Sequence, residues 1–130
     1  MAKKNEAPNT VSKHISDFLD YIVEASSQYA QSHSEMLEQE NLTQDYLHKL
    51  ELESLTSSDR SKIARRLGIC RQKRREAKDT FEELSPLIDW SGDPDVIKVI
   101  RKLQETLGQT RKVERSHQNR IYIPKVLKDN

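Results

Sequence analysis

The chain holds little of what compact folds with pockets are built from. Its 130 residues include only 3 Gly, 4 Pro and 1 Cys, and aromatic residues make up 5% of the total. Few Gly and Pro leave little material for the tight turns of a β-sheet protein, and a single cysteine excludes an intramolecular disulfide. Apolar residues reach 34%, against about 45–50% in typical globular domains. These scarcities favour helices that each bury one narrow stripe.

Long apolar runs are also missing. No stretch approaches the ~20 apolar residues that a membrane span needs. The first ten residues are polar and lack the apolar segment of a secretory signal. We therefore predict a cytoplasmic protein that does not bind membranes, with residues 1–10 forming a disordered arm. At this length the chain is expected to form one domain.

A coiled-coil stripe is clearest between residues 63 and 88. Its side chains recur at alternating steps of four and three, which is the spacing of a coiled-coil seam. All members are apolar except Arg74. They are Ile63, Leu67, Cys70, Arg74, Ala77, Phe81, Leu84 and Ile88.

Apolar periodicity predicts three helices, over about 12–54, 59–84 and 94–117. Short connections make successive helices antiparallel, so the predicted fold is all-α, an elongated antiparallel three-helix bundle or coiled coil over residues 11–118. The rest of the chain, residues 119–130, is predicted to be an extended tail because a proline discourages helix there.

Turn residues set the predicted helix boundaries. Asp59 is the expected N-cap of the second helix. Ser85-Pro86 is expected either to end that helix or to begin a short extra turn. The same cap-then-proline pattern places the start of the third helix at Pro94.

A DNA-reading helix-turn-helix is an alternative for the middle of the chain, with its turn at Gly68 and Arg71–Lys78 as recognition helix. That fold needs apolar anchors about six and ten residues after the glycine. Those positions hold Arg74 and Lys78. We therefore predict one continuous helix through Gly68.

Charge is distributed unevenly along the chain. Residues 1–58 hold 4 Lys or Arg and 10 Asp or Glu, whereas residues 59–83 hold 9 and 5. The basic run has two interpretations: pairing with the acidic first helix, or a surface for nucleic acid or an acidic partner. Lys62, Arg65 and Arg75 point away from the stripe, so they are the candidate binding residues on this helix.

Arg74 interrupts the apolar stripe and suggests a polar layer inside the bundle. The helix register places Gln39 and Glu40 opposite it, with Glu114 of the third helix nearby. Such a layer fixes register at a cost in stability. The alternative is an arginine that buries only its stem and turns its guanidinium to water.

Catalytic and metal-binding patterns are missing. The sequence has no glycine-rich phosphate loop and no nucleophile elbow. Asp45/His48 and Glu114/His117 have the spacing of di-iron ligands, but only the second pair points inward. We therefore predict no catalytic residues, no metal and no cofactor.

Two apolar features lie outside the helical stripes. The tail carries Tyr122 and Ile123, which are expected either to fold back on the bundle or to contact a partner. Trp90 follows the second helix and is expected to cover that end of the core, with a partner anchor as the alternative.

Four segments resemble small all-helical accessory proteins of unknown function from phages and prophages of low-GC Gram-positive bacteria. They are Thr43–Leu52, Arg74–Ile88, Leu107–Glu114 and Arg120–Val126. The resemblance implies an accessory phage protein, located in the host cytoplasm, that binds a host or defence protein. It supplies no catalytic residue.

Three hypotheses for function follow. The first is a non-enzymatic interaction protein that binds a larger host or defence protein, for example as an inhibitor of a nucleic-acid-handling complex. The second is a nucleic-acid-binding protein that uses the basic second helix. The third is a structural or assembly homo-oligomer.

Overall fold

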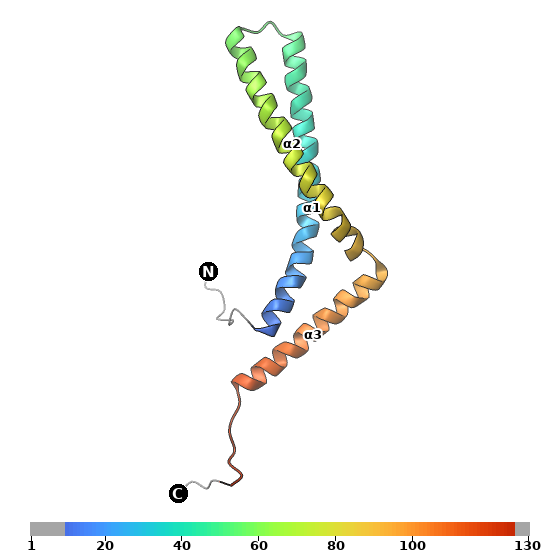
Figure 1. The fold of residues 1–130 in the computed structure, drawn as a ribbon, viewed down its shortest axis with the longest axis vertical. Coiled ribbons are helices and arrows are strands. Elements are labelled where there is room, and N and C mark those ends of the chain that lie inside the picture. The colour runs from blue at the N-terminus through green and yellow to red at the C-terminus, as the bar shows by residue number, and fades with distance from the viewer. Residues whose placement is uncertain (1–9, 127–130) are drawn as a thin grey trace. The chain divides into compact units, whose positions relative to one another are not determined.

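The computed structural model describes residues 10–126, and within that range it contains three helices and no strand. They are α1 (Val11–Leu52), α2 (Ser57–Ser91) and α3 (Pro94–Gln118) (Figure 1). The all-α prediction is confirmed, and so is the helix order. Residues 1–9 of the predicted arm and residues 127–130 of the predicted tail lie outside the described residues. No helix in the described part is long and apolar enough to cross a membrane.

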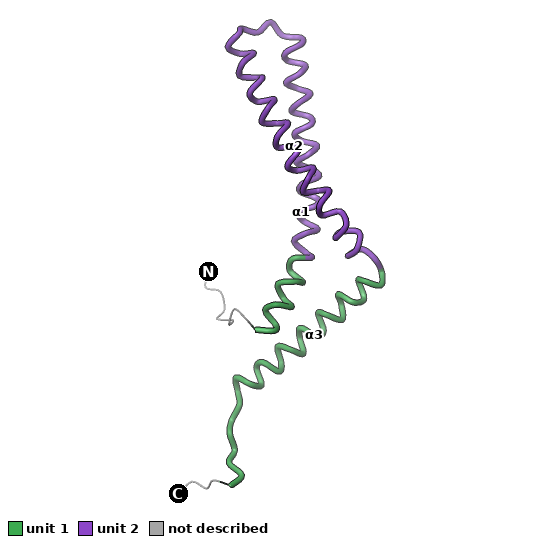
Figure 2. The backbone as a smooth tube through the Cα atoms, viewed as in Figure 1, with its two compact units in different colours: residues 1–21, 94–130 green, residues 22–93 purple. Residues whose placement is uncertain are grey.

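The chain divides into two compact units, which Figure 2 colours separately. Unit 1 comprises the chain up to Tyr21 together with Pro94 onward, and unit 2 comprises Ile22–Asp93. Helix α1 therefore contributes its first turns to unit 1 and the remainder to unit 2. The sequence predicted one helical bundle over 11–118; the helix–helix contacts are consistent with an all-α bundle, and they group into these two units.

Unit 2 is a pair of antiparallel helices, formed by residues 22–52 of α1 and by α2 and joined by residues 53–56 (Figure 1). The predicted stripe of α2 forms its inner face, because its eight members alternate between buried and half-buried. On the α1 side, Ala25 is completely buried and Ile22 nearly so. Tyr29 of α1 stacks on Phe81 of α2 with ring centroids 4.4 Å apart.

Helix α2 begins and ends at different residues from those predicted. Its N-cap is Thr56, whose side-chain oxygen accepts a hydrogen bond from the Asp59 backbone N–H at 3.1 Å. Asp59, the predicted cap, instead lies in the first turn. Its negative charge there stabilises the helix by interacting favourably with the positive end of the helix dipole. At the other end α2 continues through Pro86 to Ser91. Burial of Leu84 and half-burial of Ile88 keep this last part on the inner face.

Gly68 lies inside the continuous helix α2, so the structure contains no helix-turn-helix at this position. A Cβ added at Gly68 would meet no atom within 4 Å. We therefore expect Gly68→Ala to raise the free energy of unfolding by about 1 kcal/mol, because alanine loses less backbone entropy in a helix. Thermal unfolding by circular dichroism measures this, with Gly108→Ala, equally unobstructed, as the parallel case in α3. A loss of stability at Gly68 alone would argue for a break in α2 there.

Unit 1 pairs the first turns of α1 with α3. Leu19 of α1 and Leu107 of α3 are its buried apolar side chains in the described part of the chain. The start of α1 lies beside the end of α3, since the Ser12 backbone N–H donates to a Glu114 carboxylate oxygen at 3.1 Å. After α3 the chain leaves the helix and remains irregular to residue 126.

Candidate functional site

The predicted binding residues are all exposed, and they are divided between the two units. Lys62, Arg65 and Arg75 lie on α2 in unit 2. Tyr122 and Ile123 lie beyond α3 in unit 1, and each is 77% exposed. The described tail is therefore not packed back on the helices, which was one of the two expectations for it. Trp90 is 43% exposed, so it is partly buried and partly accessible.

A groove runs along one side of the α1–α2 pair in unit 2. It consists of three adjoining hollows, of about 330, 160 and 420 Å³ from the interhelical loop inward. Arg66 lines both the first and the second, and Lys73 lines both the second and the third. We call these three hollows together the side groove.

Each hollow of the side groove takes residues from both helices. The hollow near the loop is lined by Lys49, Glu53, Leu55, Asp59, Lys62, Ile63 and Arg66. The middle hollow is lined by Gln39, Leu42, Tyr46, Arg66, Ile69, Cys70 and Lys73. The inner hollow is lined by Gln31, Ser32, Glu35, Lys73, Glu76, Ala77 and Thr80.

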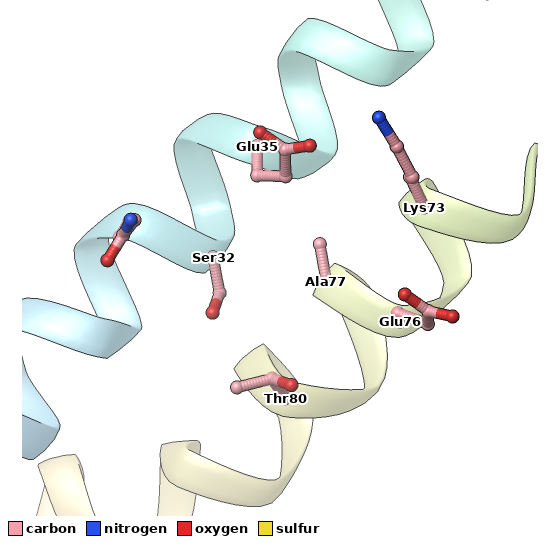
Figure 3. A pocket seen from close by; sticks show the side chains of 7 residues that line it. Ser32, Glu35, Lys73, Glu76, Ala77 and Thr80 are labelled. Carbon is pink, nitrogen blue, oxygen red and sulfur yellow. The ribbon is translucent and has the colours of Figure 1, made fainter. Parts of the chain in front are cut away.

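The side groove follows from the heptad pattern. Lys62, Arg66, Ile69 and Lys73 recur at steps of four, three and four, parallel to the apolar stripe and directly beside it. Unit 2 contains only two helices, so within the unit no further helix packs against these flanking positions, and they form the wall of an open groove. Small residues deepen it, as Figure 3 shows where Ser32 of α1 and Ala77 of α2 line the inner hollow.

The middle hollow combines an apolar floor with positive charge. Leu42 and Tyr46 are half-buried there and Ile69 is 47% exposed. Arg66 and Lys73 are its charged residues, and no carboxylate lines it. In the described part of the chain neither cation takes part in an ion pair. Both end hollows contain carboxylates, such as Glu35, which stands across from Lys73 in Figure 3.

The other side of the α1–α2 pair carries the charged contact of the predicted polar layer. The Arg74 Nε donates to the Glu40 carboxylate at 2.9 Å, and the Arg74 side chain is 20% exposed. Gln39 is buried and its amide donates to Glu35 at 3.0 Å instead. Glu114, the fourth residue predicted for the polar layer, lies in unit 1 and accepts a hydrogen bond from Ser12. The structure thus brings together Arg74 and Glu40.

Replacing Arg74 by leucine tests what this pair does. The change places an apolar residue on the inner face and leaves Glu40, with its side chain 40% exposed, solvated by water. We expect the free energy of unfolding to rise by about 1 kcal/mol, and the register of the α1–α2 pair to become less unique. Thermal melting and analytical ultracentrifugation measure both. Glu40→Gln is the control for loss of charge alone, and an unchanged melting temperature and oligomeric state would mean that Arg74 only buries its stem.

The start of α1 is capped from two directions. Thr10 accepts a hydrogen bond from the Lys13 backbone N–H at 3.2 Å, as an N-cap residue does. Glu114 of α3 accepts from both the backbone N–H and the hydroxyl of Ser12. These bonds satisfy donors that a helix start leaves without an intrahelical partner. The pKa of Glu114 is lowered, first by the hydrogen bond from the Ser12 hydroxyl and then by the one from the Ser12 backbone N–H. Electrostatic interaction with Arg111 and His117 lowers it further.

The lowered pKa of Glu114 predicts a pH-dependent contribution to the α1–α3 contact. An unfolded chain ionises this carboxyl at its ordinary pKa of about 4.3. The contribution is therefore present above that pH and is lost as the pH falls through the lower folded-state pKa. We expect Glu114→Gln to lower the melting temperature at pH 7 and to differ progressively less from the parent below about pH 4. Glu105→Gln is the matched control on the exposed side of α3, and a Glu114→Gln deficit that stays constant with pH would contradict this role.

The metal-ligand candidates remain separate. Among the described residues no group of three or more His, Cys, Asp or Glu side chains lies close enough to hold a metal ion. Glu114 of the Glu114/His117 pair is engaged with Ser12. Cys70 is buried in the floor of the side groove.

Sequence reasoning missed the side groove and the Ser12–Glu114 contact. The groove had a signal, since the row Lys62, Arg66, Ile69 and Lys73 repeats with the same period as the stripe beside it. Ser12 and Glu114 are 102 residues apart and share no pattern that links them. Comparison with known proteins does not assign the site, because no family model, no curated protein and no solved structure matches this chain.

Proposed function

We propose that this chain is a non-enzymatic interaction protein that binds a larger protein through unit 2. The observation that supports the proposal is the side groove, an open channel of three adjoining hollows along the α1–α2 pair, of which the middle one has an apolar floor. Grooves of this kind between two helices accept a helix or an extended segment of a partner. The resemblance to phage accessory proteins suggests a host or defence protein as the partner, for example one within a nucleic-acid-handling complex.

Exposed residues outside the groove extend the proposed contact. Lys62 lines the groove at its loop end, while Arg65 and Arg75 line none of its three hollows. In unit 1, the exposed Tyr122 and Ile123 of the tail offer apolar side chains that a partner surface can cover. We assign these residues a supporting role in binding, with the groove as the principal site.

Nucleic-acid binding is the second candidate, because Arg66 and Lys73 carry positive charge along one edge of the groove. Carboxylates of Glu35, Glu53 and Glu76 lie in the end hollows of the same groove and would repel phosphates. Binding through several phosphates weakens log-linearly with rising salt. A gel-shift series with DNA and RNA at low and moderate salt therefore separates the two candidates.

Affinity capture from the native cell tests the principal proposal. The tagged full chain is expected to retain a specific protein after nuclease treatment, and Ile69→Gln in the groove is expected to release it. Arg71→Gln is the matched control, because Arg71 is exposed on α2 and lines none of the three hollows. Capture that depends on intact nucleic acid would support the second candidate. A discrete homo-oligomer with no heterologous partner would favour a structural or assembly role and would contradict the proposal.

A further inference from the structure

The side groove has the dimensions of a helix-binding site. Its lining on α2 extends from Asp59 to Thr80, and at the helical rise this corresponds to about 30 Å. A partner helix of about 20 residues covers that length. Lining residues recur on both walls with helical spacing, for example Leu42, Tyr46 and Lys49 on α1. A third helix laid here would meet side chains at regular intervals, as in a three-helix coiled coil.

The middle hollow determines what such a helix must carry. Leu42, Tyr46 and Ile69 offer a partly exposed apolar floor, which suits an apolar anchor residue. Arg66 and Lys73 stand at the ends of this floor without ion-pair partners in the described part of the chain. Carboxylates of a partner that pair with these two cations would fix the register of the bound helix and raise its association rate.

Pairing of this groove with the same groove of a second copy is electrostatically unfavourable. In an isologous dimer each surface meets its own copy, and residues related by the two-fold axis face each other. Arg66 and Lys73 lie at equal sequence distances on either side of Ile69 and Cys70. An antiparallel pairing centred there places Arg66 of one copy against Lys73 of the other. Such like-charge juxtaposition disfavours self-association through this face.

We infer that the side groove binds an amphipathic helix of a partner protein, with an apolar anchor over Ile69 and carboxylates that pair with Arg66 and Lys73. This inference rests on the proposed function and names the chemistry of the partner segment. An acidic amphipathic helix is the occupant that can both cover the apolar floor and pair with the two cations.

Synthetic helices test the inference directly on the full chain. The probes are three stapled, fluorescent peptides of about 18 residues, or five turns. All three share one leucine face, and they carry Glu, Gln or Lys at the positions flanking it. By fluorescence anisotropy we expect the Glu peptide to bind about tenfold more tightly than the Gln peptide, and the Lys peptide not to bind. The Glu preference should shrink as salt rises.

Variants locate the binding to the middle hollow. The double change Arg66→Gln and Lys73→Gln should remove the preference for the Glu peptide while leaving affinity for the Gln peptide unchanged. Ile69→Gln should weaken both peptides, and it is tolerated by the fold because Ile69 is 47% exposed. The matched control is Arg71→Gln with Lys78→Gln, which removes two positive charges of α2 that line none of the three hollows and should change neither affinity.

The outcomes separate this inference from the proposed function. Equal binding of the three peptides, or a Glu preference that survives loss of Arg66 and Lys73, would overturn the inference. A cellular partner captured through Ile69 would leave the proposed function standing in that case. Displacement of the Glu peptide by a short DNA duplex at moderate salt would overturn it in favour of phosphate binding. Dimerisation of the chain that Ile69→Gln abolishes would overturn it in favour of a second copy.

Discussion

Replacing Phe81 by alanine is expected to lower the free energy of unfolding by about 3 kcal/mol, the low end of the range for truncating a buried aromatic residue. Phe81 is half-buried on the inner face of α2 and stacks on Tyr29 at a centroid distance of 4.4 Å. The His33 ring packs against it at 5.3 Å, tilted by 37°. The change removes both the apolar area and the aromatic contacts, each of which stabilises the α1–α2 pair.

Chemical denaturation followed by circular dichroism measures this loss. Phe81→Leu should recover more than half of it, because leucine keeps the apolar volume and loses only the ring contacts. Phe18→Ala is the matched control, since the Phe18 side chain is 47% exposed and should cost less than about 1 kcal/mol. Equal losses at Phe18 and Phe81 would mean that the aromatic contact does not anchor unit 2.

Replacing Pro86 by alanine is expected to stabilise the protein by about 2 kcal/mol. Pro86 lies inside α2, is exposed, and has no N–H to donate to the carbonyl one turn before it. A proline in a helix interior costs about 3 kcal/mol relative to alanine. Removing the proline also increases the conformational entropy of the unfolded chain, and this offsets up to about 1 kcal/mol of that gain. The helical term is larger, so the net effect is stabilising.

Pro94→Ala provides the control for Pro86→Ala. Pro94 is the first residue of α3, where a missing N–H has no cost and the fixed backbone angle is favourable. Its replacement should leave the melting temperature unchanged or slightly lower. A fall in stability for Pro86→Ala would contradict this and show that α2 needs the proline to keep Ile88 on the inner face.

Helical periodicity is a local property of the chain. The sequence alone therefore determined the features that follow from it, namely the helices and their apolar faces. The stripe from Ile63 to Ile88 predicted both the helix and its inner face, and Arg74 was recognised as its polar interruption. The continuity of α2 through Gly68 also followed, since the stripe passes the glycine without a change of phase. The end of α2 was misplaced because the local cost of Pro86 was considered without the half-burial of Ile88, which follows the proline on the inner face.

Pairings between distant residues depend on how the helices pack, so only the tertiary structure decided them. The sequence left Gln39, Glu40 and Glu114 as equivalent partners for Arg74, and packing selected Glu40. It likewise brought Ser12 to Glu114 across 102 residues. The side groove exists because residues beside the stripe remain open when two helices pair. A pattern fixes which face of a helix is apolar, but the number of helices against that face decides which residues beside it stay uncovered.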